Sequence, residues 1–171
     1  MSQRAPSLRP KRIRQITGRD PFASSRLELI ADAAGSVAIG WIATGVLYAR
    51  TVGDISAEVG KVQAARIQGF AEAVTQLSFF IDASQLKQYD LLARSAFVRA
   101  VLANRRKFSE LVMLSVAEGE TPAEQSLVSV VGEPFDILRA PDDFEDRLLE
   151  LAPQARHTIA LKPSSTAQSS R

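Results

Sequence analysis

Residues 33–49 read AAGSVAIGWIATGVLYA and contain no charged side chain. In a helix, these seventeen residues would span about 26 Å, slightly less than the roughly 30 Å thickness of a bilayer's hydrocarbon core. Extending the helix back to Leu27 supplies the missing length, with Glu28 near the interface and Asp32 about one turn inside. We therefore expect a transmembrane helix over residues 27–50. The alternatives are a buried helix in a helical bundle and, with less support, a mitochondrial-type presequence.

Small residues recur within this segment at helical spacing. Ser36, Gly40 and Thr44 follow one another at intervals of four residues, so they would share one face of a helix. Small side chains at this spacing allow two transmembrane helices to approach closely. We therefore expect Ser36, Gly40 and Thr44 to pack helices together in a homo-oligomer, or against another envelope protein.

The segment that precedes the apolar stretch is strongly basic. Residues 1–26 contain one acid, Asp20, and seven cationic residues, Arg4, Arg9, Lys11, Arg12, Arg14, Arg19 and Arg26. We expect this tail to be disordered and to contact anionic membrane lipid. Because basic residues remain on the cytoplasmic side, the tail predicts a single-pass protein of the cell inner membrane with a cytoplasmic N-terminus. No A-x-A cleavage site follows, so the helix would be an uncleaved signal anchor.

Residues 51–107 show mainly helical periodicity. One apolar stripe has steps of three and four residues and comprises Ile55, Val59, Val62, Phe70, Val74, Leu77 and Ile81. Arg66 occupies one position where this stripe expects an apolar residue. A second helix is predicted over residues 84–107, ending in Arg105, Arg106 and Lys107. These three cations are a charged helix end or, alternatively, a binding patch for an acidic partner. The apolar stripe requires a cover, which predicts coiled-coil packing against this second helix or a partner.

The pattern changes in residues 108–161, where we expect a small α/β region. Residues 110–116 and 127–131 are short and rich in β-branched residues, which predicts two strands. Residues 141–151 predict an amphipathic helix that starts at Pro141, and residues 157–161 a third short strand. Residues 162–171 form a polar tail that we expect to be disordered. The predicted fold is thus mainly α, with an N-terminal transmembrane helix, long amphipathic helices and a small C-terminal α/β region.

Two segments together resemble the membrane-proximal, extracytoplasmic region of bacterial sensor proteins of the Cache or PAS type. They are LARSAFVRAVLA at residues 92–103 and ELVMLSV at residues 110–116. In that family, a helix of this kind precedes the first strand of the sensing sheet. The resemblance implies a ligand-sensing or partner-binding module, and it identifies no ligand.

A competing resemblance connects the chain to TetR-type helix-turn-helix regulators. The residues that carry it are TVGDISAEVG at 51–60, RLELIADAA at 26–34, the pair Gly40-Trp41, and Phe70. It implies a recognition helix over residues 63–70, with Arg66 reading bases in the major groove. Under this alternative, the partner is nucleic acid and the protein is a soluble transcriptional regulator.

The sequence excludes or disfavours several kinds of chemistry. There is no cysteine, and His157 is the only histidine, so thiolate chemistry and two-histidine metal sites are ruled out. The glycines match neither the dinucleotide-binding nor the P-loop pattern. An acidic cluster, Asp142, Asp143, Glu145 and Asp146, is interpreted as a solvated helix start, with a cation site as the alternative. We therefore expect a non-catalytic protein without cofactor: a single-pass membrane protein with an extracytoplasmic, sensor-like or partner-binding module.

Overall fold

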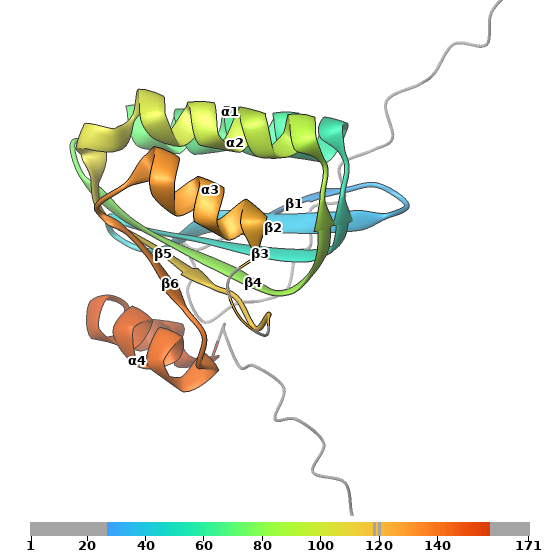
Figure 1. Cartoon of the computed structure of the whole chain (residues 1–171). Coiled ribbons are helices and arrows are strands. Elements are labelled where there is room, and N and C mark those ends of the chain that lie inside the picture. The colour runs from blue at the N-terminus through green and yellow to red at the C-terminus, as the bar shows by residue number, and fades with distance from the viewer. Residues whose placement is uncertain (1–26, 118, 120, 158–171) are drawn as a thin grey trace, which may run out of the picture.

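The computed structural model describes residues 27–117, 119 and 121–157. Its described part is a three-layer α/β/α domain, with a mixed sheet between two helical layers (Figure 1). The strands are β1 (Glu28–Ala31), β2 (Gly35–Ala43), β3 (Val46–Ile55), β4 (Leu77–Tyr89), β5 (Phe108–Leu114) and β6 (Phe135–Leu138). The α-helices are α1 (Ala57–Glu72), α2 (Leu91–Ala103), α3 (Pro122–Val131) and α4 (Pro141–Leu151). Two short 3-10 helices, η1 (Arg105–Lys107) and η2 (Pro153–His157), complete the described elements.

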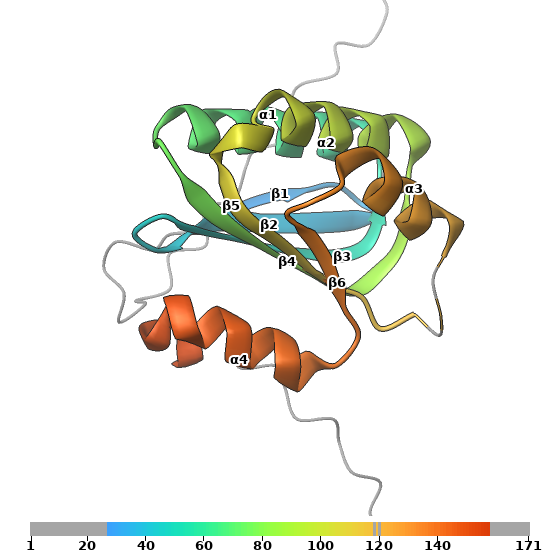
Figure 2. The same cartoon turned by 60° about the vertical axis from the view of Figure 1, so that its left-hand side comes forward.

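The six strands lie side by side in their order along the chain. β1, β2 and β3 form an antiparallel meander, whereas β3, β4, β5 and β6 are parallel. Each pair of neighbouring parallel strands is connected through a helix, and such crossovers are almost always right-handed. Because β3 to β6 follow one another in the same direction across the sheet, right-handed crossovers place all three connecting helices on one face. Accordingly, α1, α2 and α3 cover one face of the sheet and α4 covers the other (Figures 1 and 2).

The uncharged stretch at residues 33–49 is not a helix. It forms most of β2, a turn at residues 44–45, and the first part of β3. Gly45 has a positive φ of 73°, the left-handed conformation that a tight hairpin turn requires. Both faces of these strands are covered, so the stretch lacks the alternation of apolar and polar residues that marks a half-exposed strand. A hairpin buried on both sides therefore has the composition of an apolar helix.

The expected mainly α fold with a transmembrane helix is therefore wrong. Among the described residues, no helix combines the length and the apolar character needed to cross a membrane. Asp32, placed inside the bilayer by the helical interpretation, instead caps a turn, because its Oδ1 accepts hydrogen bonds from the amides of Ala34 and Gly35. The coiled-coil expectation is also wrong, since α1 and α2 both pack on the sheet. Residues 1–26 and 158–171, expected to be tails apart from the strand at 157–161, lie outside the described residues.

The helical stripe predicted from Ile55 to Ile81 corresponds only in its middle part to a helix. α1 begins after Ser56, whose side chain accepts a hydrogen bond from the amide of Val59, and ends at Glu72. Ile55 lies in β3, and Ile81 lies in β4. Similarly, the helix predicted over residues 84–107 begins only after Asp90, which caps α2. The first residues of that prediction belong to β4, a thirteen-residue strand.

The C-terminal predictions had mixed outcomes. A strand near residues 110–116 is confirmed as β5, and the helix at residues 141–151 is confirmed as α4. Residues 127–131, predicted as a strand, lie instead in α3. A reciprocal capping box starts this helix: the Thr121 side chain accepts from the amide of Glu124, and Glu124 accepts from the amide of Thr121. The hydrogen bonds at the start of α3 thus favour a helix, although the second half of this helix is rich in β-branched valine.

The structure also contradicts the helix-turn-helix alternative. Residues 26–34, expected as the opening helix of that family, contain β1 and the Asp32 turn. Residues 51–60, expected as the first helix of the helix-turn-helix, begin in β3, which extends to Ile55. The recognition segment at residues 63–70 lies inside α1, where Ile67 is fully buried. Arg66, expected to contact bases, forms an ion pair with Glu28 of β1 at 2.8 Å. No helix-turn-helix therefore occurs in residues 27–117.

Candidate ligand-binding cavity

A cavity of about 480 Å³ lies on the α1–α2–α3 face of the sheet, near the carboxyl ends of the parallel strands. Ligands of open α/β sheets bind preferentially at this edge, and pockets for small molecules have volumes of roughly 300 to 1,000 Å³. The contributing elements are β3, β4, β5, α1, α2 and α3, together with the segment that follows β5. Its position and size are those of a small-molecule site.

Unequal strand lengths create the space. β5 ends at Leu114, which pairs with Asp82, whereas β4 continues beside β3 as far as Tyr89. Among the described residues, the last part of β4 thus has a strand partner on one side only. The β3–β4 register shifts twice here, and the resulting bulges, together with Lys87, disfavour the addition of another regular strand. The unpaired side of β4 borders the cavity instead.

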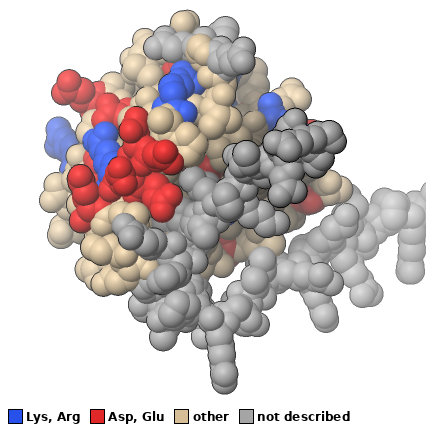
Figure 3. Space-filling view, turned by 90° about the horizontal axis from the view of Figure 1, so that it is seen from below, with Lys and Arg blue, Asp and Glu red and all other residues tan. Residues whose placement is uncertain are grey.

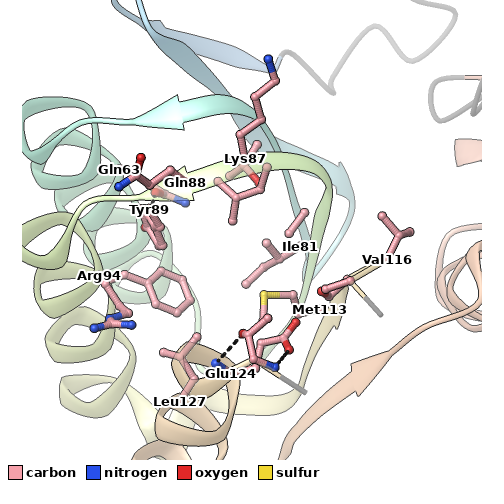
Figure 4. Close-up of a pocket in the computed structure, with 17 residues that line it drawn as sticks. Gln63, Ile81, Lys87, Gln88, Tyr89, Arg94, Met113, Val116, Glu124 and Leu127 are labelled. Carbon is pink, nitrogen blue, oxygen red and sulfur yellow. Dashed lines mark hydrogen bonds between the residues drawn. The ribbon is translucent and has the colours of Figure 1, made fainter. Parts of the chain in front are cut away.

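The cavity wall is mainly apolar. Aliphatic, aromatic and thioether side chains from the sheet and the helices form it, namely Ile81, Ala83, Leu86, Phe97, Met113, Val116, Ala117 and Leu127. In Figure 4, Ile81 and Met113 lie in the middle of the group, between Gln63 and Tyr89 on one side and Glu124 and Leu127 on the other. Such a wall favours an apolar molecule, because burying apolar surface contributes about 25 cal/mol per Å².

Neutral polar residues interrupt the apolar wall, namely Thr51, Gln63, Gln88, Tyr89, Ser115 and Thr121. The Tyr89 hydroxyl donates a hydrogen bond of 2.8 Å to Gln63 Oε1, and the Thr51 hydroxyl donates one of 3.2 Å to the carbonyl of Asp82. Burial raises the pKa of Tyr89, so its hydroxyl is protonated at neutral pH. These groups can form hydrogen bonds with a ligand without contributing a charge.

Glu124, at the opposite side of the cavity from Gln63, is held by an ion pair. Two bonds join it to the guanidinium of Arg139, at 2.9 and 3.0 Å. Burial alone would raise the pKa of Glu124, but hydrogen bonds from Arg139, Ser115 and Thr121 outweigh it and lower this pKa to about 2. Glu124 is consequently ionised, paired and unsuited to act as a general base.

The two cations that line the cavity, Lys87 and Arg94, lie at its margin. Lys87 is exposed, and its amine points away from the other lining residues in Figure 4. Arg94 is half-buried at the start of α2, with its guanidinium on the side away from Ile81 and Met113. The central part of the cavity is therefore surrounded by neutral groups.

A second polar cluster lies on the other face of the sheet. Asp82, only 1% exposed, accepts hydrogen bonds from Tyr48 Oη at 3.2 Å and from Arg50 Nε at 2.9 Å. The other carboxylate oxygen of Asp82 accepts from the amide and the hydroxyl of Ser84. Burial, with the charge of Asp82, raises the pKa of Tyr48. Because Asp82 lies between the cavity residues Ile81 and Ala83, this cluster anchors the part of β4 that forms the cavity wall.

The residues predicted to pack transmembrane helices lie in and next to β2. Ser36 and Gly40 are in the strand, where Gly40 pairs with Tyr48, and Thr44 is in the following turn. They do not share a helical face, so the proposed helix packing through Ser36, Gly40 and Thr44 is wrong. The physical reason is the period of two residues per repeat in a strand.

The basic run at residues 105–107 is η1, between α2 and β5. Arg105 donates to the carbonyl of Glu133, and Lys107 donates to the carbonyl of Ala71 at 2.6 Å. These two cations therefore cap carbonyl groups of the fold, and Arg106 is exposed. A role for Arg105, Arg106 and Lys107 in binding a partner stays a prediction.

The predicted acidic cluster lies on α4. Asp and Glu side chains gather on the underside of the molecule, the side of this helix (Figure 3). Its members Asp142, Asp143 and Asp146 are exposed. Arg147 lies beside them and binds Glu110 and Asp136. No group of three potential metal ligands occurs in the described part of the chain.

The cavity itself was not predicted from the sequence. Gln63 carried no signal, because the predicted apolar stripe does not include it. Thr51 and Tyr89 carried none, because β3 and the end of β4 were interpreted as helical. Only the pairing of these strands brings Thr51, Gln63 and Tyr89 to the same cavity.

Comparison with known proteins assigns the chain to no family. No protein-family model matches the chain, and no curated protein matches its sequence. The class that the described residues define is a mixed α/β domain with a six-stranded sheet and a cavity at the carboxyl ends of its parallel strands.

Proposed function

We propose that this chain is a non-catalytic, sensor-like module that binds a small, largely apolar molecule in the cavity between the sheet and helices α2 and α3. The observation that carries this proposal is the cavity itself, formed where β4 continues past the end of β5. Its volume of about 480 Å³ and its mainly apolar wall are typical of sites that bind small molecules.

The arrangement of the lining residues supports binding rather than catalysis. The buried carboxylate, Glu124, is paired with Arg139, and the hydroxyl of Tyr89 is bonded to Gln63. The cavity lining contains no histidine and no cysteine that could act as a base or a nucleophile. The neutral, mainly apolar centre of the cavity fits an uncharged, mainly apolar molecule.

Methionine methyl groups provide a direct test. The chain contains two methionines, and Met113 lines the cavity, so methyl-¹³C-methionine labelling gives one signal at the site. We expect naphthalene, as an apolar probe, to shift the Met113 signal in a saturable way. At ten times its Kd, it should also stabilise the fold by about 1.4 kcal/mol, through mass action.

A variant that fills the cavity supplies the control. Ala83→Phe places an aromatic ring at the wall and should abolish the titration, whereas Ala103→Phe, at an exposed position of α2, should leave it unchanged. If the Met113 signal of the unaltered protein does not respond to naphthalene, the proposed function is wrong.

A further inference from the structure

Gln63 is a buried side chain with an unused hydrogen-bond donor. It is 1% exposed and lines the cavity from α1. Its Oε1 accepts the Tyr89 hydroxyl, while its Nε2 donates to no group among the described residues. Among the described residues, Arg50 Nη2 is the fully buried side-chain atom that lacks a partner, so Gln63 Nε2 remains accessible from the cavity. Because the side chain borders the cavity, a molecule in the cavity can supply the missing acceptor.

The neighbouring hydroxyls offer the complementary function. The protons of Thr51 and Tyr89 are committed to Asp82 O and to Gln63 Oε1, so both oxygens present only lone pairs to the cavity. The site thus combines one N–H donor with hydroxyl acceptors. An alcohol or phenol group matches this set, since its oxygen can accept from Gln63 and its proton can be donated to Thr51 or Tyr89.

The neutral side chains next to Gln63 in the cavity disfavour an ionised ligand at this position. Gln63, Thr51 and Tyr89 are neutral, and Glu124 on the other side is compensated by Arg139. An ionised carboxylate buried next to them would lose its hydration without gaining a counter-charge. Arg94 could only serve an anion at the margin of the cavity.

We infer that the cavity selects a neutral, mainly apolar molecule that carries a hydroxyl group, and that Gln63 recognises this hydroxyl. This inference rests on the proposed function, because it concerns the ligand of the same cavity. Gln63 then acts as a specificity-determining residue, while the apolar wall supplies most of the affinity.

Three probes with one ring system test the inference: 2-naphthol, naphthalene and 2-naphthoate, each titrated against the Met113 methyl signal at pH 7. One neutral hydrogen bond to a group that is otherwise unpaired corresponds to about a five- to tenfold change in Kd. We therefore expect 2-naphthol to bind about five- to tenfold more tightly than naphthalene, and 2-naphthoate to bind more weakly than either.

Variants of Gln63 separate recognition from packing. Gln63→Leu should bring the affinity for 2-naphthol to within twofold of the affinity of the same variant for naphthalene. Gln63→Met, which keeps the length of the side chain, provides the same test should the leucine variant not fold. Gln68→Leu is the matched control, because Gln68 is exposed on the same helix and bonds only to Glu72. It should retain the preference for 2-naphthol.

The outcomes distinguish the inference from the function on which it rests. Equal affinities for 2-naphthol and naphthalene, or a preference that survives in Gln63→Leu, would overturn the inference and leave a cavity that binds apolar molecules. Tightest binding of 2-naphthoate would also overturn it, in favour of an anion site at Arg94. Absence of binding by all three probes would overturn both proposals.

Discussion

At the scale of single residues, two buried carboxylates are neutralised in different ways. Asp82 bonds to Tyr48, Arg50 and Ser84 within the sheet. Glu124 connects the start of α3 to Arg139, which follows β6. Removing one partner of a buried pair leaves a charge without compensation, so such residues contribute strongly to stability even when the pair itself gains little. Both carboxylates therefore hold segments that form the cavity.

The lowered pKa of Glu124 predicts a specific pH dependence. Because this pKa is about 2 in the folded state and near 4.5 in the unfolded chain, ionised Glu124 stabilises the fold above pH 4.5. That contribution is lost as the pH falls toward 2. We expect Glu124→Gln to lower the free energy of unfolding at pH 7 by about 2 kcal/mol, a value reduced from full linkage because Arg139 is partly exposed.

Urea unfolding of the unaltered protein and Glu124→Gln between pH 7 and pH 2.5 measures this effect. The difference between them should shrink steadily below pH 4.5. Glu150→Gln, at an exposed position of α4, is the control and should change stability by less than about 0.5 kcal/mol. A difference that stays constant down to pH 2.5 would contradict the assignment to Glu124.

At the scale of secondary-structure elements, the contact between α1 and α2 depends on a glycine. A Cβ atom at Gly60 would lie 2.2 Å from Ala93 Cβ and 2.6 Å from Ala93 Cα. No methyl group fits at these distances, so the two helices approach more closely there than any other residue allows. Their spacing also fixes Gln63 and Phe97 at the cavity.

This contact predicts opposite effects for two substitutions in the same helix. Gly60→Ala should destabilise the fold by about 2 kcal/mol or more, because forcing an extra methyl group into a packed contact outweighs the roughly 1 kcal/mol gain in helix propensity. Gly69→Ala should stabilise it by about 0.5 to 1 kcal/mol, since a Cβ there meets no atom within 4 Å. Thermal and urea unfolding measure both, and equal effects of the two changes would refute the packing argument.

At the scale of the whole molecule, the sheet separates two cores. The larger core lies under α1, α2 and α3, and the smaller one lies between the sheet and α4. Phe144 of α4 is 1% exposed and contacts the ring of Phe80 edge-on, at 5.7 Å between centroids. The cavity belongs to the first core, so α4 stabilises the domain without contacting the ligand site.

Removing the Phe144 ring should separate these roles. We expect Phe144→Ala to lower the free energy of unfolding by about 3 to 4 kcal/mol, the usual cost of such a truncation in a core. The Kd for naphthalene, measured at a temperature where the variant is folded, should stay within twofold. Leu151→Ala, at a position 43% exposed, should cost less than about 1 kcal/mol. A large loss of affinity in Phe144→Ala would show that the two faces are coupled.

Local sequence signals were sufficient for some elements. α4 has Pro141 at its start, and apolar residues such as Phe144 and Leu148 recur at helical spacing on one face, so its bounds follow from the sequence. β5 was also located, because its β-branched and aliphatic residues follow a clear helix end. The sequence alone identifies no residue of the site, because the predicted apolar stripe contains Val59 and Val62 but not Gln63.

The sequence alone establishes the composition of each buried segment. It also predicts the helices that have one polar face, because the spacing of the polar residues reveals the helical repeat. Whether the charge-free residues 33–49 formed one helix or a hairpin was decided only by the tertiary structure. A segment covered on both faces has no polar side to reveal its period, and its conformation therefore depends on what packs against it. The cavity has the same origin, because it exists only where strands of unequal length lie side by side.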